Sequence, residues 1–296
     1  MLSFEKILGM RVPTPLLCTA CGLALLSAVY AFQRPFRQYT SMEGYDAIPM
    51  PPDWREKTEW VFARLMYPEH PNALFGGWGR FGRRGLLDWR EGGTSWTQDY
   101  PRADRHFAQA LRRLTRIHVR SIEQPVNPDE TDDFFNWPWM NAGEMGDWKL
   151  TAAEARTLRE YLLRGGFLML DDFWGPEEYA RFDESMKAVF PDHPVVDMPN
   201  DDAIFHTVYN LDDRYQVMGQ WGLNPNRGGM FRRRALGTVA HWMGVYDEKS
   251  RVMVAISFNS DIGDSWEWAD DPGYPEKFSA LGIRIGVNYV VYAMTH

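Results

Sequence analysis

The sequence predicts an α/β protein with a mostly parallel sheet and helices on both faces. Strand-like and helix-like segments alternate along the chain, as in proteins built from strand–helix–strand units. Phe167–Leu170 is a short apolar run without alternation, as expected for a central strand covered on both faces. Gly165-Gly166 precedes it and supplies the left-handed turn between a helix and a strand.

The first half of the domain contains strand and helix patterns in alternation. Phe107, Leu111 and Leu114 recur at helical spacing. Pro138 limits the strand that contains it to an edge or a strand end. We therefore predict a strand at Glu59–Tyr67, a helix at Asp104–Arg116, and strands at Ile117–Ile122 and Phe134–Met140.

The second half begins with a strong helix start. Thr151 and Glu154 form a capping box for a helix that runs to Arg164. Pro176 occupies the first turn of the next helix, after the Phe167–Leu170 strand. Beyond it we predict strands at Val239–Tyr246 and Arg251–Phe258, a turn at Asp247–Ser250, an acidic loop at Asn259–Trp268 and a closing helix at Glu276–Ala293.

Residues 12–33 carry no charge and are long enough to span a bilayer. A cleaved signal peptide, with Val29-Tyr30-Ala31 before the cleavage site, is one interpretation. A retained signal anchor is favoured, because the apolar region is long and Arg34 follows it directly. We expect a single-pass protein of the bacterial inner membrane with its main domain in the periplasm. The expected organisation is an anchor at 1–34, a linker at 35–57 and an α/β domain at 58–296.

Two segments are candidates for contact with a partner. Pro51 and Pro52 lie in the polar linker, which is expected to be an extended arm lying on a partner. Trp78, Trp89 and Trp96 lie in or beside a long glycine-rich insertion, and a loop of this length is usually functional or docks on something. We expect all five residues to contact a larger integral membrane complex.

Composition excludes several functions. The net charge of −8 argues against nucleic-acid binding, which needs a basic face. Cys18 and Cys21 both lie in the apolar segment, so the domain has no disulfide, thiolate metal site or cysteine nucleophile. We predict no cofactor, since Gly76-Gly77-Trp78-Gly79 lacks the strand–turn–helix context of a phosphate loop.

Asp171 and Asp172 are the first candidate site, because ligands gather at the carboxyl ends of strands in open α/β sheets. The pair could act as general acid and base or bind a cation. Alternatively, one aspartate caps the Pro176 helix and the other binds loop amides, which is the favoured interpretation. His206 could serve them as a base, although a packed, hydrogen-bonded histidine is favoured there.

Asn259, Asp261 and Asp264 form a second, weaker candidate. Their side chains resemble the ligands of a hard cation in composition. Their spacing differs from that of the EF-hand, whose twelve-residue loop ends in a glutamate. The spacing therefore favours a loop without a metal ion, with a calcium site as the alternative.

Several motifs carry a resemblance to a known family. They are Leu162-Leu163-Arg164-Gly165-Gly166, Phe167-Leu168-Met169-Leu170-Asp171-Asp172, Val189-Phe190-Pro191, Ile204-Phe205-His206, Ser257-Phe258-Asn259-Ser260-Asp261-Ile262-Gly263 and the stretch Leu281–Ala293. From Trp60 onward, the chain resembles the bacterial family called "domain of unknown function 4159". The resemblance implies a class I glutamine amidotransferase-type domain, related to flavodoxin-like folds, and often membrane association. It implies no established activity.

Two departures from the amidotransferase pattern shape the expected function. The domain lacks the cysteine nucleophile, and Met140–Glu144 lacks a histidine that many family members carry. We expect a non-catalytic, membrane-anchored accessory subunit that stabilises a larger complex. Similarity to such subunits suggests a photosynthetic reaction-centre and light-harvesting complex. The alternative is a periplasmic hydrolase or ligand-binding protein that uses Asp171, Asp172 and His206.

Overall fold

The computed structural model describes residues 36–45, 48–73, 88–223 and 239–296. Residues 37–296 form one compact unit, built around a seven-stranded sheet. The strand order is β2-β1-β3-β4-β7-β6-β5, and the first five strands in this order are parallel. The last two are antiparallel. The strands are β1 (Ala63–Leu65), β2 (Gln124–Val126), β3 (Trp139–Ala142), β4 (Phe167–Leu170), β5 (Val196–Asp197), β6 (His241–Tyr246) and β7 (Val252–Phe258).

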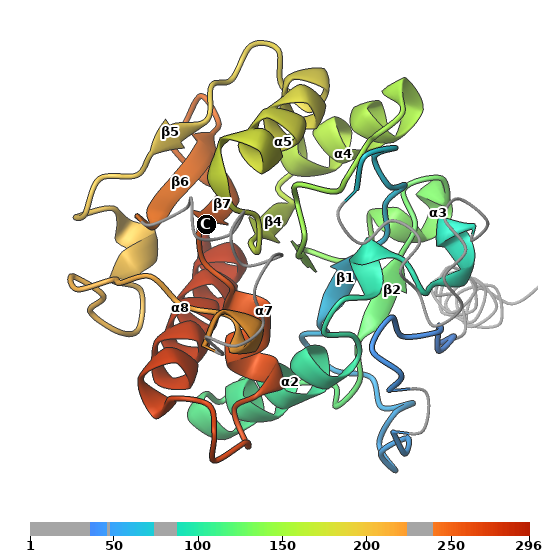
Figure 1. Cartoon of the computed structure of the whole chain (residues 1–296), viewed down its shortest axis with the longest axis vertical. Coiled ribbons are helices and arrows are strands. Elements are labelled where there is room, and N and C mark those ends of the chain that lie inside the picture. Colours follow the sequence, from blue (N-terminus) through green and yellow to red (C-terminus); the bar gives the residue numbers. More distant parts are fainter. Residues whose placement is uncertain (1–35, 46–47, 74–87, 224–238) are drawn as a thin grey trace, which may run out of the picture. The chain divides into compact units, whose positions relative to one another are not determined.

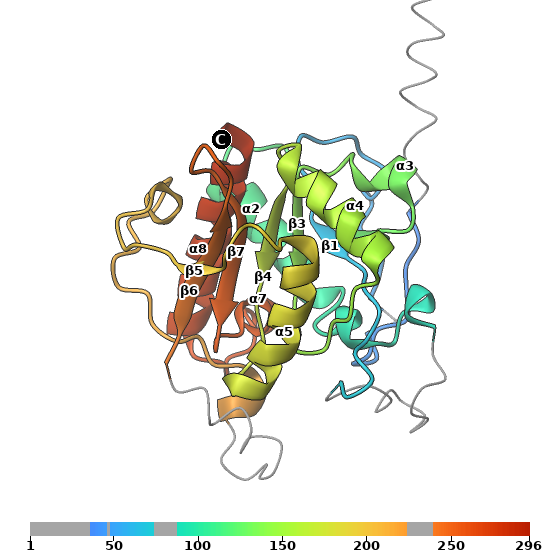
Figure 2. The same cartoon turned by 90° about the horizontal axis from the view of Figure 1, so that it is seen from above.

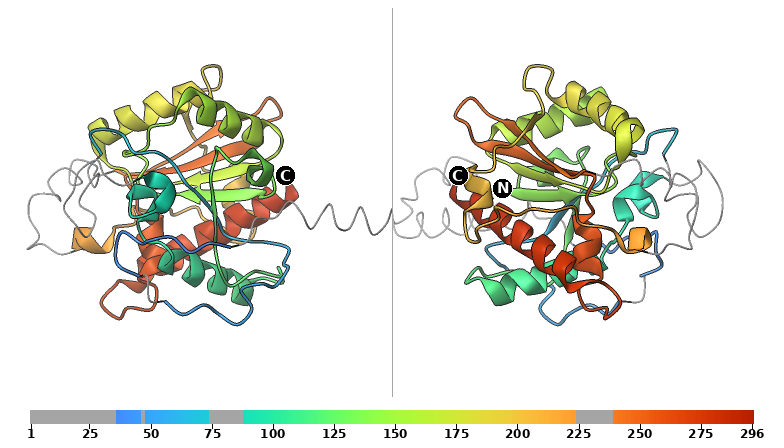
Figure 3. Two further views of the ribbon diagram at one scale, coloured as in Figure 1. Left: turned by 90° about the vertical axis from the view of Figure 1, so that its right-hand side faces the viewer. Right: turned by 60° about the vertical axis from the view of Figure 1, so that its left-hand side comes forward.

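Two layers of helices cover the sheet (Figures 1 and 2). The predicted mixed α/β architecture, with a mostly parallel sheet, is confirmed. Both views of Figure 3 show the strands running between the two layers. One layer contains α4 (Ala152–Leu163) and α5 (Gly175–Val189); the other contains α2 (Arg102–Leu114), α7 (Ile262–Glu267) and α8 (Glu276–Thr295), while the short α3 (Thr131–Phe134) precedes β3.

Strand β4 explains why both layers are needed. Leu168 and Leu170 pack with the side chains of α4 and α5, whereas Phe167 and Met169 pack with those of α2 and α8. All four side chains are buried. Alternate residues of a strand point to opposite faces, so an unbroken apolar run requires an apolar layer on each side. This confirms the prediction that Phe167–Leu170 is a central parallel strand.

Local signals placed several elements correctly. The capping box of α4 is present, with Thr151 Oγ1 accepting from the Glu154 amide and Glu154 Oε2 from the Thr151 amide. The β6–β7 hairpin and the closing helix also lie where they were predicted. A capping box and a regular helical period are read from neighbouring residues, so tertiary contacts do not need to be known.

Three predicted segments need correction. The second strand lies at Gln124–Val126 rather than Ile117–Ile122, of which Val119 forms an isolated bridge with Trp60. The third strand begins only at Trp139, and it is central because Pro138 precedes it and leaves its hydrogen bonding intact. The acidic segment predicted as a loop contains α7, which Asp261 caps.

The proline-containing arm is also different from the expectation. Residues 35–57 were predicted to form an extended arm and not a packed element, but the described residues 37–45 and 48–57 contact the chain's own α/β domain. The Tyr39 amide donates to Tyr100 Oη at 3.1 Å, and Arg112 Nη1 on α2 donates to Asp53 Oδ2 at 2.7 Å. In Figure 3 the blue N-terminal segment runs along the α2 side. Pro51 is half-buried and Pro52 is exposed.

Most described tryptophans are in the core. Trp60, Trp139 and Trp266 are buried together with Phe62 and Phe107 in one aromatic cluster. Trp96 is 0% exposed and donates from Nε1 to the Trp89 carbonyl at 2.7 Å. Trp89 packs against the core and is half-buried, whereas Trp78 lies outside the described residues. Trp96 is therefore not available for the partner contact predicted for it.

The predicted membrane anchor, residues 12–33, also lies outside the described residues. In the part of the chain that the structure describes, no helix combines the length and the apolar character needed to cross a bilayer.

Candidate metal centre

The carboxyl ends of the parallel strands form an edge that is rich in acidic side chains. Asp171 and Asp172 follow β4, and Asn259 and Asp261 follow β7. Four residues here have left-handed backbone conformations: Asp99 (φ 60°), Glu144 (φ 53°), Asp172 (φ 52°) and Asn259 (φ 58°). Such conformations cost free energy in non-glycine residues and cluster at functional sites. The edge also contains the reversal of strand order between β1 and β3, where open α/β sheets bind ligands.

Asp171 binds the amides of a neighbouring loop, and Asp172 binds a side chain of its own loop. Asp171 Oδ2 accepts from the amides of Ile262 and Gly263, each at 2.7 Å. Burial, and secondly the charge of Asp172, raises the pKa of Asp171 to about 7. Asp172 Oδ1 accepts from Trp174 Nε1 at 2.7 Å. Asp171 is therefore held by a segment that is distant in sequence, whereas Asp172 is held by a donor two residues away.

Neither aspartate caps α5, contrary to the favoured sequence interpretation. The Trp174 amide at the start of this helix donates to Glu178 Oε2 at 2.7 Å. The next amide, of Gly175, donates to Asn259 Oδ1 at 2.9 Å. The second half of that interpretation, an aspartate that binds loop amides, describes Asp171 well.

His206 does not join this edge. It follows the short helix η4 (Ala203–Phe205), which packs against α8. Its Nε2 lies 2.9 Å from the carbonyl oxygen of Asn200, and its Nδ1 contacts Asn210 Oδ1. Both ring nitrogens are thus engaged by asparagines, and neither hydrogen-bonds with Asp171 or Asp172. The structure places the predicted base apart from the predicted acidic pair.

The second predicted motif is divided between two roles. Asn259 is structural, since its side chain accepts from Gly175 and donates from Nδ2 to the Val239 carbonyl at 2.8 Å. Asp261 caps α7 by accepting from the Asp264 amide at 2.8 Å. Asp264 Oδ2 accepts from the Gln220 amide at 2.6 Å. Asp261 and Asp264 nevertheless keep their carboxylates near a third one, that of Asp99.

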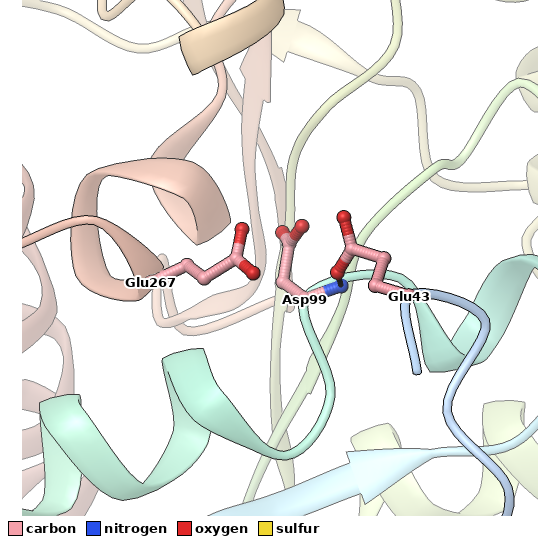
Figure 4. Close-up of side chains that lie close together, drawn as sticks. All are labelled: Glu43, Asp99 and Glu267. Atoms are coloured by element: carbon pink, nitrogen blue, oxygen red, sulfur yellow. Dashed lines mark hydrogen bonds between the residues drawn. The ribbon is translucent and has the colours of Figure 1, made fainter. Parts of the chain in front are cut away.

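Asp99 connects two groups of carboxylates. In one group, oxygens of Asp99, Asp261 and Asp264 lie within 4.8 Å of one another; in the other, oxygens of Glu43, Asp99 and Glu267 do so. In Figure 4, Asp99 lies between Glu267, which extends from α7, and Glu43, which extends from the N-terminal arm. We call these five side chains the carboxylate cluster.

Two oxygens of the cluster lack hydrogen-bond donors. Asp99 is 5% exposed and Glu267 is 0% exposed, and neither Asp99 Oδ1 nor Glu267 Oε2 has a partner among the described residues. The other glutamate, Glu43, accepts from Gln98 Nε2 and from the Asp99 amide, each at 2.8 Å. A buried carboxylate oxygen without a donor is costly. Since both belong to side chains of the carboxylate cluster, a proton or a cation is needed there to offset this cost.

Burial and mutual repulsion act on the cluster in the same direction. Burial raises the pKa of Glu267 to about 10, with further contributions from Glu43 and Asp264. Burial raises the pKa of Glu43 to about 7, with a contribution from Asp264. The pKa of Asp99 is raised well above its ordinary range by burial and then by Asp264. The carboxylates therefore retain protons at neutral pH unless a cation replaces them.

The nearby arginines are already paired. Arg64 donates from Nε to Asp104 Oδ2 at 2.9 Å and from Nη1 to the carbonyls of Trp96 and Gln98. Arg102 donates to Asp270 at 2.7 Å. Within the described ranges, neither Glu43, Asp99 nor Glu267 forms an ion pair with a basic side chain.

Two glycines allow the carboxylates to approach the backbone closely. A Cβ atom at Gly263 would overlap Asp99 Oδ2. One at Gly219 would overlap Asp261 Oδ2 and lie 2.9 Å from Asp264 Oδ2. Since any side chain at these positions would displace an aspartate, both glycines are part of the construction of the site.

The donor set is made of oxygen atoms alone. Carboxylates with no histidine or thiolate select hard cations such as Ca²⁺ and Mg²⁺. Magnesium usually keeps several of its waters, whereas calcium accepts many protein oxygens in irregular geometry. The buried, irregular cluster therefore fits calcium better than magnesium.

Sequence reasoning missed Asp99, Glu43 and Glu267. One local signal existed: Asp261, Asp264 and Glu267 recur at intervals of three residues. In a helix, residues at this spacing are neighbours on one side. No comparable signal marks Glu43 or Asp99, which reach the cluster only through the tertiary fold.

Comparison with known sequences gives a family but no activity. No curated protein matches the chain. A family model matches residues 86–294, a range that contains Asp99 and Glu267 but not Glu43. That family is described as Domain of unknown function (DUF4159), and since its model covers more than half of the chain, the protein belongs to this family.

Proposed function

We propose that this protein is a calcium-dependent domain in which the carboxylate cluster binds a hard divalent cation. The observation that carries the proposal is that two side chains of the cluster, Asp99 and Glu267, each have a buried oxygen without a donor among the described residues, Oδ1 and Oε2 respectively. A cation supplies the charge that these groups lack. Its ligands come from the arm, from the turn before α2 and from α7, so the ion joins segments that are distant in sequence.

The burial of the cluster favours a structural ion over a catalytic one. Asp99, Asp261, Asp264 and Glu267 are all buried, whereas a catalytic metal keeps a position open for water or substrate. The alternative hydrolase function also loses its proposed base, because His206 binds Asn200 and Asn210.

Calcium titration of the full-length protein tests the proposal, using calorimetry and thermal unfolding in EDTA and in CaCl₂. We expect the wild-type protein to bind Ca²⁺ and to gain about 2.7 kcal/mol of stability at 100 times the dissociation constant. Asp99→Asn and Glu267→Gln should lose this gain. Asp201→Asn removes an exposed carboxylate elsewhere and should bind Ca²⁺ as the wild type does.

The opposite outcome is equally clear. If the protein takes up no Ca²⁺ and unfolds at the same temperature with and without EDTA, protons neutralise the cluster and the proposal is wrong. Titration with Mg²⁺ separates the two hard cations. We expect weaker binding of Mg²⁺, because the ion gives up its waters reluctantly.

The order of the strands supports a more specific fold assignment. The order β2-β1-β3-β4-β7 among the parallel strands is the order of flavodoxin-like sheets, which supports an amidotransferase-like domain.

The accessory function in a larger membrane complex stays a prediction, and so does the photosynthetic reaction-centre complex as that partner. Its main supports, residues 12–33 and Trp78, lie outside the described residues. Mild-detergent extraction followed by size separation and mass spectrometry tests it, and a chain that migrates alone would count against it.

A further inference from the structure

The carboxylate cluster divides into two sets of three side chains that share Asp99. We call Glu43, Asp99 and Glu267 the Glu43 centre (Figure 4). We call Asp99, Asp261 and Asp264 the Asp261 centre. Within each set, the three ligand oxygens lie within 4.8 Å of one another. Calcium binds oxygens at roughly 2.3–2.6 Å, so two ligands of one ion are at most about 5 Å apart. Each set therefore fits the ligand sphere of a single ion.

Asp99 supplies the observation that points to a ligand in both centres. Its side chain is 5% exposed, and its Oδ1 has no donor among the described residues. An ionised carboxylate has two oxygens with about four lone-pair sites, so it can bind one ion through each oxygen. An ion in the Glu43 centre therefore uses only part of the capacity of Asp99. The rest of that capacity lies beside Asp261 and Asp264.

The backbone of Gly219 brings the other two ligands of the Asp261 centre together. A Cβ atom at this position would lie 2.2 Å from Asp261 Oδ2 and 2.9 Å from Asp264 Oδ2. Both oxygens are therefore close to the same point, and Asp261 and Asp264 are 1% and 3% exposed. Carboxylates that meet in a buried place need a proton or a cation between them. Oxygen ligands alone select a hard cation.

Hydrogen bonds fix the orientation of these two ligands. Asp261 Oδ1 accepts from the Asp264 amide at 2.8 Å. Asp264 Oδ1 accepts from Trp268 Nε1 at 3.2 Å, and Asp264 Oδ2 accepts from the Gln220 amide at 2.6 Å. Carboxylates that bind metal ions are usually held by such donors, which orient them for the ion. The donors around Asp261 and Asp264 are thus those expected around a metal centre.

We propose that a second hard divalent cation binds in the Asp261 centre and that Asp99 bridges the two ions. The proposal rests on the proposed function, because the first ion occupies the Glu43 centre and shares Asp99 with the second. Ions in two-metal sites lie roughly 3.5–4 Å apart. Since two cations at this distance repel each other, we expect the second ion to bind about 5–150-fold more weakly than the first.

The two ions hold different parts of the protein. The ligands of the Glu43 centre come from the arm, from the turn before α2 and from α7. Those of the Asp261 centre come only from the turn before α2 and from the start of α7. The second ion therefore fixes α7 beside α2 without any contribution from the arm, and a substitution in the arm should leave it in place.

Calcium titration of the full-length protein by calorimetry tests the second ion through the number of ions bound. We expect the wild type to bind two Ca²⁺ ions in two steps. Asp261→Asn should bind one, and asparagine keeps an oxygen for the Asp264 amide, so the cap of α7 is retained. Glu43→Gln should also bind one, whereas Asp99→Asn should bind none. Asp201→Asn, outside the cluster, should bind two.

Trp268 provides a second measurement, because its indole binds Asp264 directly. Terbium(III) takes oxygen ligands as Ca²⁺ does, and it emits light when a nearby tryptophan is excited. We expect Trp268→Phe to reduce this emission strongly in the wild type and in Glu43→Gln. In Asp261→Asn the same change should reduce the emission much less, because the remaining ion lies in the Glu43 centre.

The outcomes separate the second ion from the function on which it rests. If the wild type binds one Ca²⁺ and Asp261→Asn binds it equally well, the second ion is wrong and the proposed function stands. If the wild type binds one Ca²⁺ and both Asp261→Asn and Glu43→Gln lose it, all the carboxylates serve one ion and the second ion is again wrong. If no Ca²⁺ binds, both proposals fail. Should Asp261→Asn not fold, the number of ions bound by the wild type still decides.

Discussion

Asp99 and Asp104 are both buried at the start of α2, yet they are balanced in different ways. Asp104 receives a bidentate guanidinium from Arg64, with Nε at 3.1 Å from Oδ1 and 2.9 Å from Oδ2. Both partners are almost fully buried. Asp99 instead lies among carboxylates, and its Oδ1 has no donor among the described residues. Equal burial therefore leads to a complete ion pair in one case and to a missing positive charge in the other.

The comparison also shows how the pair supports the cluster. After binding Asp104, Arg64 uses Nη1 to bind the carbonyls of Trp96 and Gln98, directly before Asp99. The ion pair thus fixes the backbone that presents Asp99. Arg64 therefore neutralises Asp104 and also holds the backbone beside Asp99, where we propose that a cation binds. Substitutions at Asp104 and at Asp99 show whether the ion pair and the cation site can be lost separately.

The largest expected effect comes from Asp104→Asn. This change leaves the buried Arg64 guanidinium without an anion, and arginine does not lose its proton. We expect a loss of about 3–5 kcal/mol in the free energy of unfolding, measured with urea. The loss should be the same in EDTA and in CaCl₂, because asparagine still offers an oxygen to Arg64 and Asp99 stays in place.

A different result would break the comparison. If Asp104→Asn abolishes the calcium response while costing little stability, Asp104 belongs to the cation site and the two aspartates are not separate. Asp99→Asn gives the converse control. It should remove the calcium response while leaving the Arg64–Asp104 pair intact.

Much of the fold could be predicted because its signals are local. The apolar run of β4, the capping box at Thr151 and the period of α8 all depend on residues that are neighbours in sequence. Strand β2 could not be placed, because Gln124-Pro125-Val126 has neither apolar alternation nor length. Its pairing with β1 makes it a strand, and that pairing is a tertiary contact.

The candidate site was predictable only in part for the same reason. The edge of the sheet and the acids Asp261 and Asp264 could be found, since strand ends and nearby carboxylates are visible in sequence. Glu43 and Asp99 could not, because more than fifty residues separate one from the other and more than a hundred and fifty separate Asp99 from α7. The proline arm was misplaced because its partners are on α2, distant in sequence.

An intermediate effect is expected from pH in the absence of cations. Raised pKa values mean that the folded protein holds protons that the unfolded chain has released. Stability therefore falls as pH rises from the unfolded pKa values near 4 through about 7 for Glu43 and toward about 10 for Glu267. We expect the free energy of unfolding in EDTA to fall by about 1–3 kcal/mol between pH 5 and pH 8.

Saturating Ca²⁺ should flatten this dependence, since the cation then balances the carboxylates in place of protons. Asp104→Asn should keep the slope measured in EDTA, and Asp99→Asn should reduce it. Urea unfolding across the pH range measures all four conditions. A wild-type slope that is unchanged by Ca²⁺ would show that the titrating groups and the cation are not linked.

The smallest effect is expected at the rim of the cluster. Tyr45→Phe removes the hydroxyl that donates to Glu267 Oε1. Since Glu267 Oε2 already lacks a donor among the described residues, this buried carboxylate then loses a donor at its other oxygen too. In EDTA the loss of this hydrogen bond should cost about 1 kcal/mol. In CaCl₂ the cost should be smaller, because the ion can take the oxygen that Tyr45 has vacated. Thermal unfolding in the two buffers measures the difference. An equal loss of stability in both buffers would mean that Glu267 does not bind an ion. Asp99 would then differ from Asp104 only in being neutralised by a proton, where Asp104 is neutralised by Arg64.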